Sequence, residues 1–328
     1  MRGPHTFRAL GDIRPEQLQH AADRHDLGRV VTAEPLGGAY GNNLALTTDR
    51  GVWVLRGIVP PLDVTTLRRE RFFARVVHER STVASPWPYL IDEASDIFGW
   101  PYAVMPRLSG HVLHFGLDIR WPRIGAALGR IVADLHRITF LHVGEWDADR
   151  DVIVAPDVPW ADWFLARVQR LQNRVAETSS LDAESAYWVD DLVSAGSAAI
   201  GAFDPTYVHG DLGIGNFVGD TTPAGFAFTG VFDLGGGYAG DPDEDLAIPL
   251  WWPLYWRNVD AARAFFDSYR AEHPARPGEA ARLRAYVAIS LLSNWEAGHR
   301  QGHDWYGGCA TFREWAGPLL ERVEEIVR

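Results

Sequence analysis

The dominant spacing of apolar residues changes near Gly110, and this change restricts the folds that the chain can adopt. Before Gly110, short apolar runs between turn residues are typical of β-strands, and they predict strands at 30–36, 43–48, 52–59 and 102–108, the last of which breaks at Pro106. After Gly110, apolar residues recur at every third or fourth position, which is the period of an α-helix. The sequence therefore predicts an α+β fold, with a small antiparallel β-sheet lobe at the N-terminus and a large, mostly helical lobe after it.

Helices are expected in both lobes. In the first lobe, Pro15 stands at the start of a helix that ends before Gly28, and residues 65–80 carry apolar side chains on one side and arginines elsewhere. In the second lobe, the same period predicts helices at 121–135, 160–177, 183–199, 259–272, 278–300 and 312–327. The chain has no internal repeat and no low-complexity linker, and we divide it into residues 1–105 and residues 106–328.

Composition favours a cytoplasmic protein. The 328 residues are 47% hydrophobic, which is enough for a large core in two lobes. No run approaches eighteen uncharged apolar residues, so no transmembrane helix is expected, and the first residues lack the apolar core of a secretory signal. The single cysteine, Cys309, excludes an internal disulfide and a cysteine-rich metal site.

The charged residues narrow the chemistry further. The formal net charge of −12 argues against nonspecific nucleic-acid binding and favours a cationic or neutral partner, although solubility alone also explains it. All 31 Lys and Arg residues are arginines. The absence of lysine excludes Schiff-base chemistry, an anchor for pyridoxal phosphate and the glycine-rich phosphate loop that ends in Lys-Ser/Thr. A phosphate would have to be bound by arginine, backbone N–H groups or a metal.

The stretch YVHGDLGIGNFV, at 207–218, carries an acid and an amide on a loop between two strands. Asp211 could accept a proton from an attacking hydroxyl, and Asn216 could ligate a divalent cation through its carbonyl oxygen. Asp233 ends the following strand and precedes three glycines, which let a backbone approach a ligand closely. Such oxygen donors suit Mg²⁺ and phosphate better than zinc. Zinc is also disfavoured because His209 has no second His or Cys at ligand spacing.

The order of these residues resembles the aminoglycoside phosphotransferase family, which has a protein-kinase-like fold. The shared pattern is His-Gly-Asp, an Asn five residues after that Asp, Asp-Leu-Gly, and then Gly-Asp-Pro with Asp-Leu-Ala at 240–247. The resemblance implies that Asp211 is the catalytic base or the anchor for the substrate hydroxyl. It also implies that Asn216 and Asp233 bind Mg²⁺, and that ATP or GTP is the phosphoryl donor.

The resemblance makes residues 1–105 the nucleotide-binding lobe. The segment LGGAYGNNLAL lies where kinase-like folds carry a glycine-rich flap, so Gly38 is expected at the phosphates, although a glycine pair also fits an ordinary hairpin. Arg56 holds the place of the basic residue that contacts the α- and β-phosphates, and its fork can bind phosphate oxygens. Glu70 is the first choice for its acidic helix partner, with Glu79 second.

The segment PYAVMPRLSG resembles the hinge between the lobes. Adenine is expected to pair with the carbonyl of Pro106 and the N–H of Leu108, since proline has no N–H to offer. Met105 either borders the adenine or belongs to the core. Asp241 and Asp245 are expected to be structural: Asp245 stands at a helix start, where a carboxylate caps free N–H groups, and in kinase-like folds an acid near this point also ties down the catalytic loop.

The motifs leave the acceptor open, because the family phosphorylates hydroxyls on aminoglycosides, macrolides, choline, homoserine and sugars. Residues 250–258 and 265–292 resemble the C-terminal part of hygromycin B phosphotransferases, so an aminoglycoside like hygromycin B is the first choice. Glu296, Asp304 and Trp305 are then expected to bind it, with carboxylates on ammonium groups and an aromatic face on a sugar ring or cation. For these residues an ordinary solvated helix end is the alternative.

Two other functions stay open at this point. The chain could be a kinase of another small molecule, or a non-catalytic nucleotide-binding protein with a kinase-like fold. The presence of all three residues Asp211, Asn216 and Asp233 argues against the non-catalytic alternative.

Overall fold

The computed structural model describes residues 13–36, 42–58, 63–114, 120–178, 181–222, 225–303 and 306–328. The predicted site residues Gly38, Asp304 and Trp305 lie outside the described residues. The predicted division of the chain between residues 105 and 106 falls near the end of strand β5 (Tyr102–Pro106) and stays a prediction.

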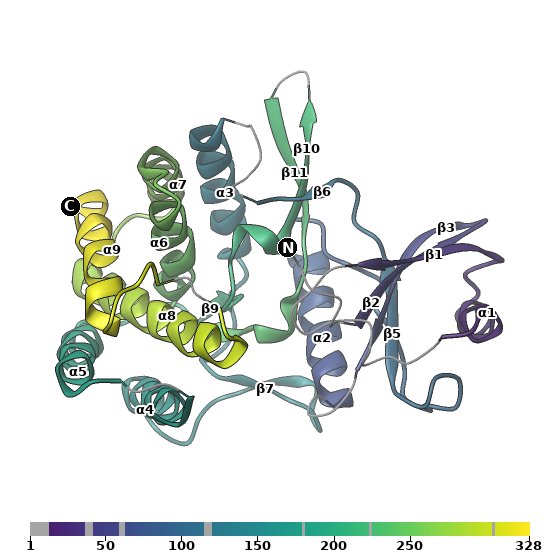
Figure 1. The fold of residues 1–328 in the computed structure, drawn as a ribbon, viewed down its shortest axis with the longest axis horizontal. Coiled ribbons are helices and arrows are strands. Elements are labelled where there is room, and N and C mark those ends of the chain that lie inside the picture. The colour runs from purple at the N-terminus through teal and green to yellow at the C-terminus, as the bar shows by residue number, and fades with distance from the viewer. Residues whose placement is uncertain are drawn as a thin grey trace.

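The N-terminal part is built on a five-stranded antiparallel sheet in the order β1-β2-β3-β5-β4 (Figure 1). Its strands are β1 (Val30–Leu36), β2 (Asn42–Thr48), β3 (Gly51–Gly57), β4 (Leu90–Asp92) and β5. Strands β2 and β3 are joined by a tight turn, because Thr48 pairs with Gly51. Strand β3 ends at Gly57, two residues before the predicted end, and β5 ends at Pro106 as expected.

Two helices cover the sheet, and the alternation of side chains along each strand decides which one a residue faces. Helix α1 (Pro15–Arg24) packs with Leu55 and Val104, whereas Ala103 and Met105 pack in the large core that includes helix α2 (Val64–Arg80). Arg56 follows Leu55 and pairs in register with Ala103. Arg56 therefore points toward α2 and the larger part of the molecule.

The rest of the chain is mostly helical (Figure 1). Its helices are α3 (Trp121–Leu135), α4 (Trp160–Thr178), α5 (Ala183–Ala198), α6 (Ala247–Tyr255), α7 (Val259–Glu272), α8 (Glu279–Gln301) and α9 (Phe312–Val327). Helices α3 and α7 lie so close together that a Cβ atom at Gly125 would collide with the carbonyl oxygen of Ala261. The glycine therefore permits the close approach. No helix in the described ranges combines the length and apolar character needed to cross a bilayer.

Short strands and 3₁₀ turns lie between α5 and α6 and carry the predicted motifs. Strand β10 (Phe217–Thr222) pairs with β11 (Gly225–Val231) and with β6 (His111–Val112), and β9 (Thr206–Val208) pairs with β12 (Tyr238–Gly240). Three 3₁₀ turns follow Asp211, Asp233 and Asp241 along the chain. They are η2 (Ile214–Asn216), η3 (Leu234–Gly236) and η4 (Pro242–Leu246). The strand-rich segment expected around residues 207–218 is thus confirmed.

The sequence patterns predict neither β4 nor the hairpin of β7 (Glu145–Asp147) and β8 (Val152–Val154), and they indicate a helix start at Asp245 without giving the extent of α6. Three-residue strands are too short to show a period. Helix α6 is apolar on most of its circumference and contains Pro249 and Pro253, so neither its period nor its composition is typical of a surface helix.

Candidate active site

Asp211 lies on the loop that follows β9, and Asn216 fixes the shape of that loop. The Asn216 side-chain amide donates to the Asp211 backbone carbonyl at 2.7 Å and to its carboxylate at 3.1 Å. Asp211 has an exposed face, yet the protein atoms packed around it raise the pKa of its carboxyl above the usual value. His209 and Asn216 oppose that rise, while the charges of Asp233 and Asp245 add to it. A raised pKa suits a group that exchanges a proton during a reaction.

His209 is fully buried and joins the loop of Asp211 to the loop of Asp233. Its Nδ1 accepts the backbone N–H of Asp211 at 3.3 Å, so Nε2 carries the ring proton and donates to the carbonyl of Phe232 at 3.2 Å. Both ring nitrogens are therefore used within the chain. This arrangement supports the expectation that His209 does not bind zinc.

Asp245 ties the loop of Asp211 to η4. Its two carboxylate oxygens accept the backbone N–H groups of His209 at 2.6 Å and Gly210 at 2.8 Å, and His136 Nε2 lies 3.4 Å away. The expected structural role is present, but the cap is wrong: Asp245 binds the loop, and Asp241 caps η4 by accepting the N–H of Asp243 at 3.0 Å.

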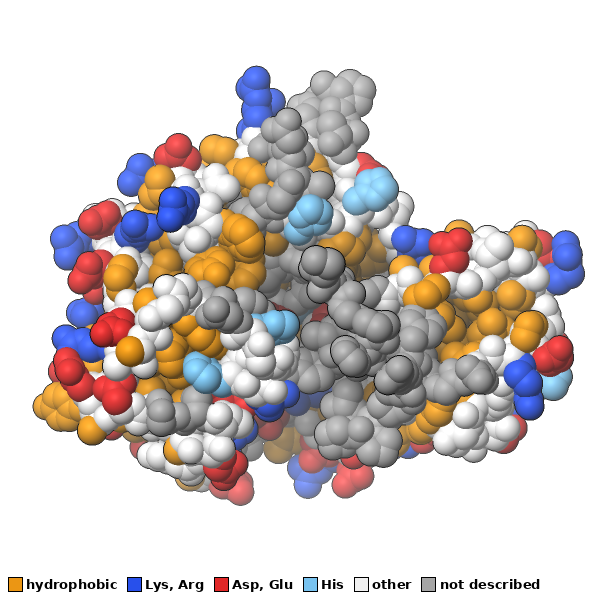
Figure 2. Space-filling view, viewed as in Figure 1, with side chains coloured by type: hydrophobic (Ala, Val, Ile, Leu, Met, Phe, Trp, Pro, Cys, Tyr) orange, Lys and Arg blue, Asp and Glu red, His pale blue; other side chains and the backbone are white. Residues whose placement is uncertain are grey.

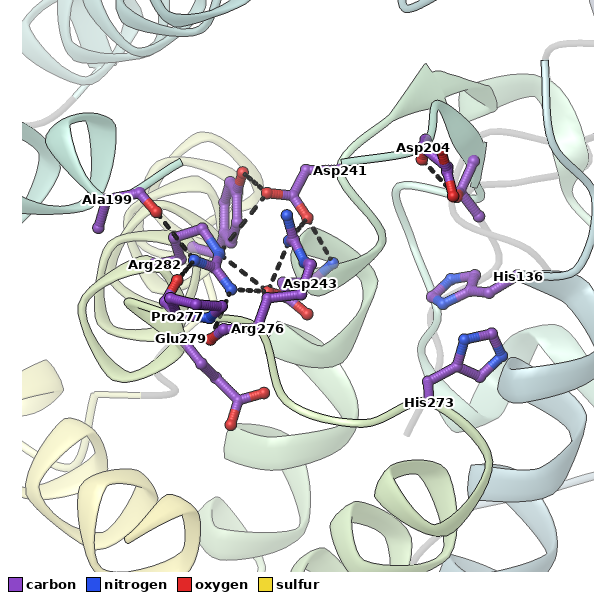
Figure 3. Close-up of polar contacts among 12 residues, drawn as sticks. His136, Ala199, Asp204, Asp241, Asp243, His273, Arg276, Pro277, Glu279 and Arg282 are labelled. Carbon is purple, nitrogen blue, oxygen red and sulfur yellow. Dashed lines mark hydrogen bonds and ion pairs between the residues drawn. The ribbon is translucent and has the colours of Figure 1, made fainter. Parts of the chain in front are cut away.

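Asp241 and Asp243 are held by arginines from α7, from α8 and from the loop between these helices, and Figure 3 labels two of them, Arg276 and Arg282. Asp243 accepts from Arg270 at 2.9 Å, Arg276 at 2.8 Å and Arg282 at 2.8 Å, and Arg276 also pairs with Asp241. Burial and the neighbouring charge of Asp243 raise the pKa of Asp241 to about 6. Asp241 and Asp243 therefore form a buried ionic network with these arginines. The network lies next to Asp245, which holds the loop of Asp211.

Asn216 and Asp233 are adjacent because a hairpin joins them. Strands β10 and β11 pair Phe217 with Val231, and the next residue, Phe232, donates its N–H to the Asn216 carbonyl at 2.9 Å. Asp233 then takes the left-handed backbone conformation, with φ 62° and ψ 51°, which aspartate tolerates better than most side chains.

The two side chains fit a magnesium ion. The amide nitrogen of Asn216 is used by Asp211, so its carbonyl oxygen is the end that remains for a ligand. The Asp233 side chain is 46% exposed. Together they offer oxygen donors only, which is the chemistry that Mg²⁺ prefers. Their role as metal ligands stays a prediction.

Arg56 and Glu70 form an ion pair beside Asp233. Arg56 Nε lies 3.1 Å from the Glu70 carboxylate, and Arg56 Nη2 lies 3.5 Å from the Asp233 carboxylate. Glu70 is 2% exposed and also accepts the hydroxyl of Tyr89 at 2.7 Å, whereas Glu79 is exposed. Burial alone would lower the pKa of Arg56, but the charge of Glu70 leads a set of interactions that raise it, so the guanidinium keeps its charge. Its contact with a nucleotide stays a prediction.

The predicted hinge, residues 101–110, contains β5 and the residues that follow it. Arg107 donates its N–H to Val52 in β3 at 3.0 Å, and the Leu108 side chain packs on Gly230 of β11. In the described part of the chain, the N–H of Leu108 donates to no other group, so it can serve a ligand. Met105 is 5% exposed and belongs to the core. The contacts of Pro106 and Leu108 with adenine stay predictions.

Glu296 lies in the last two turns of α8. It is 7% exposed, and its carboxylate pairs with Arg300 Nε at 3.0 Å, so a ligand ammonium group would have to compete with Arg300. An aromatic cluster lies nearby, with the ring of Tyr306 at 4.3 Å from that of Trp295. The acceptor role of Glu296 stays a prediction.

The sequence patterns did not single out Trp252 and Tyr255 of α6. Trp252 lines an apolar pocket together with Leu212 and Ile214, which lie between Asp211 and Asn216, and its ring stacks on that of Tyr255 with the ring centroids 5.6 Å apart. The tryptophan-rich segment was the available signal, but its helix and its position beside the loop depend on tertiary packing.

The chain belongs to the phosphotransferase enzyme family, whose sequence model matches residues 32–285. It is therefore a phosphotransferase with a protein-kinase-like fold. Among solved structures, APH(2")-IIIa in complex with GDP and kanamycin is similar, with a TM-score of 0.63 and 17% identity over 96% of this chain and 99% of that one. A thermostable mutant of APH(4)-Ia, in a ternary complex with AMP-PNP and hygromycin B, has a TM-score of 0.62 and 17% identity over 93% and 96%. No curated protein matched the sequence.

Proposed function

We propose that this phosphotransferase moves the γ-phosphoryl group of ATP or GTP to a hydroxyl of a cationic aminoglycoside, with hygromycin B as the first compound to test. The observation that carries the proposal is the meeting of Asp211, Asn216 and Asp233 beside the Arg56–Glu70 ion pair. Residues 1–105 would form the nucleotide-binding lobe, and residues 106–328 would hold the catalytic loop and the acceptor. A nucleotide-dependent reaction of this kind would take place in the cytoplasm.

Each residue of the site has a distinct task in this proposal. Asp211 orients the acceptor hydroxyl and takes its proton as the oxygen attacks the γ-phosphorus, and the nucleoside diphosphate leaves. Asn216 and Asp233 hold Mg²⁺, which when bound neutralises charge on the phosphates. Arg56 binds the α- and β-phosphates, and Glu70 keeps its guanidinium in place. Gly38 belongs to the predicted phosphate flap. Catalysis in such a site comes mainly from positioning and charge neutralisation.

The nucleotide base would bind at the hinge, with the Pro106 carbonyl as acceptor and the Leu108 N–H as donor. Both ATP and GTP remain candidates as donors. The similar APH(2")-IIIa structure contains GDP, whereas the similar APH(4)-Ia structure contains AMP-PNP.

The acceptor would lie between the catalytic loop, α6 and the end of α8. Trp252 and Tyr255 supply aromatic faces next to the loop, and Glu296, Asp304 and Trp305 are the predicted contacts. Kanamycin and hygromycin B in the similar structures support a cationic acceptor. On the described part of the face shown in Figure 2, acidic side chains are scattered among arginines and do not gather in one patch.

A panel of possible acceptors tests the proposal. The purified chain is incubated with ATP or GTP, Mg²⁺ and an aminoglycoside, a macrolide, choline or a sugar, and nucleoside diphosphate release is measured against Asp211→Asn. Phosphorylation of hygromycin B or another aminoglycoside supports the proposal. Phosphorylation of neutral acceptors alone contradicts the acceptor assignment and leaves a small-molecule kinase. No turnover with any acceptor, together with nucleotide binding, favours the non-catalytic alternative.

A further inference from the structure

Helix α2 contacts the loop of Asp233 a second time, through the residue before Glu70. Arg69 Nη2 and Nε lie 2.8 and 3.3 Å from the backbone carbonyl oxygen of Gly237, and both N–H groups donate to that one oxygen. Gly237 follows η3 and precedes β12. Arg69 therefore holds the far end of the short loop that begins at Asp233.

The loop lies directly on α2 at this point. A Cβ atom at position 237 would come 2.9 Å from the ring of Phe73 in α2 and 3.0 Å from the ring of Tyr207, so only glycine fits without a shift. One turn of α2 thus contacts both ends of the loop: Arg69 binds Gly237, while Glu70 reaches Asp233 through Arg56.

The electrostatics of Arg69 are unusual for a half-buried arginine. In the described ranges it forms no ion pair within 4 Å, and its hydrogen bonds go to a neutral carbonyl. Burial lowers the pKa of Arg69, and the charge of Glu145 opposes that effect. Desolvating a charge without a carboxylate partner is costly, and packing alone would be served by an uncharged side chain of similar length. The charge instead strengthens the bond that orients the Gly237 carbonyl.

We infer that Arg69 is a positioning residue, which holds η3 so that Asp233 keeps its left-handed backbone and presents its carboxylate to Mg²⁺. A non-glycine residue in that conformation costs about 1–2 kcal/mol, so its neighbours must hold it there. The hydrogen bond from Arg69 reaches Gly237, which is four residues after Asp233 and lies where the loop joins β12. This inference rests on the proposed function, because it takes Asp233 to be a metal ligand.

Binding of ADP with and without Mg²⁺ tests the inference without an acceptor. Arg69→Met removes the charge and keeps the length, and Arg69→Lys keeps the charge with a single donor centre. Arg68→Met is the matched control, because Arg68 is the preceding residue of α2 and pairs with Glu93 at 2.7 Å near the surface. ADP affinity is measured by calorimetry in saturating Mg²⁺ and in EDTA, and folding is followed by thermal unfolding.

The expected result is a loss of the effect of Mg²⁺ on ADP affinity. Arg69→Met should reduce the Mg²⁺-dependent gain about tenfold, equivalent to about 1.4 kcal/mol, and leave affinity in EDTA within about twofold. Arg69→Lys should recover part of the gain, and Arg68→Met should behave as wild type.

Three results would overturn the inference. These are an unchanged Mg²⁺-dependent gain in Arg69→Met, an equal loss of affinity with and without Mg²⁺, or a wild-type chain whose ADP affinity does not respond to Mg²⁺. A lower melting temperature of Arg69→Met together with an unchanged Mg²⁺-dependent gain in ADP affinity also counts against the inference, because Arg69 would then be only structural. Failure of the acceptor panel, by contrast, would refute the proposed function and leave this binding result standing.

Discussion

Replacing Glu70 by glutamine removes the negative charge from the Arg56–Glu70 ion pair and keeps the size and shape of the side chain. Arg56 Nε lies 3.1 Å from the Glu70 carboxylate, which is buried and also accepts the Tyr89 hydroxyl at 2.7 Å. Glutamine can still accept either hydrogen bond. The substitution therefore measures what the charge alone contributes to holding Arg56.

The magnitude follows from the two kinds of hydrogen bond. A hydrogen bond to a charged group contributes about 1.5–3 kcal/mol and one between neutral groups about 0.5–1.5 kcal/mol. Because Arg56 keeps its charge in Glu70→Gln, the difference of about 1–1.5 kcal/mol is the upper bound of the free energy lost in holding Arg56. If that loss falls on the phosphate contact, nucleotide affinity drops by up to about 5- to 13-fold. Arg56 Nη2 already lies 3.5 Å from the Asp233 carboxylate, so the released guanidinium should move toward Asp233 and compete with Mg²⁺.

The assay is the KM for ATP at saturating acceptor, measured across a Mg²⁺ titration. Glu70→Gln should raise both the KM for ATP and the Mg²⁺ concentration that gives half-maximal rate. Glu79→Gln is the control, because Glu79 lies in the same helix and is exposed. An ATP KM in Glu70→Gln equal to that of wild type, or the same change in Glu79→Gln, would refute the positioning of Arg56 by Glu70.

Asp211→Asn should lower turnover by about 10²–10⁴-fold and leave ADP affinity nearly unchanged, and near-normal turnover would exclude Asp211 as the base. Because the surrounding protein raises the pKa of Asp211 and the base must be ionised, turnover should fall on acidification with an apparent pKa above the usual aspartate value of about 3.9; a limb at or below that value would contradict this reasoning. Glu296→Gln should raise the acceptor KM, reduce its dependence on salt and leave the KM for ATP alone; an unchanged salt dependence would remove Glu296 from the acceptor site. Gly125→Ala should destabilise the fold by about 1–3 kcal/mol, because its Cβ collides with the Ala261 carbonyl, and an unchanged thermal midpoint would refute that packing.

Much of the fold could be predicted because long periodic segments report their own structure. The helices at 121–135, 259–272 and 312–327 have the predicted bounds, and so does the strand at 30–36. The missed elements have a common reason: β4, β7 and β8 are three residues long and gain their stability from a partner strand. Helix α6 is buried on several sides, so its sequence carries no amphipathic signal.

The candidate site was predictable where its residues are close in sequence. Asp211 and Asn216 share one loop, and the spacing alone allowed the hydrogen bonds that join them. The sequence could single out Glu296 only by its residue type, a carboxylate. Its burial and its pairing with Arg300 depend on how α8 packs, which no local pattern reports.

The sequence by itself determined the order of the longer strands and helices, the oxygen donors around residues 211 to 233, and arginine as the only Lys or Arg side chain available to a phosphate, because these depend on residue type and short-range spacing. Tertiary structure alone decided which groups meet across large separations. Arg56, Glu70 and Asp233 come from a strand, a helix and a distant loop, and they touch only because α2 packs between the sheet and η3. In the same way, Asp245 became the anchor of the catalytic loop rather than a helix cap, since unsatisfied buried N–H groups take the carboxylate that the packed chain brings to them.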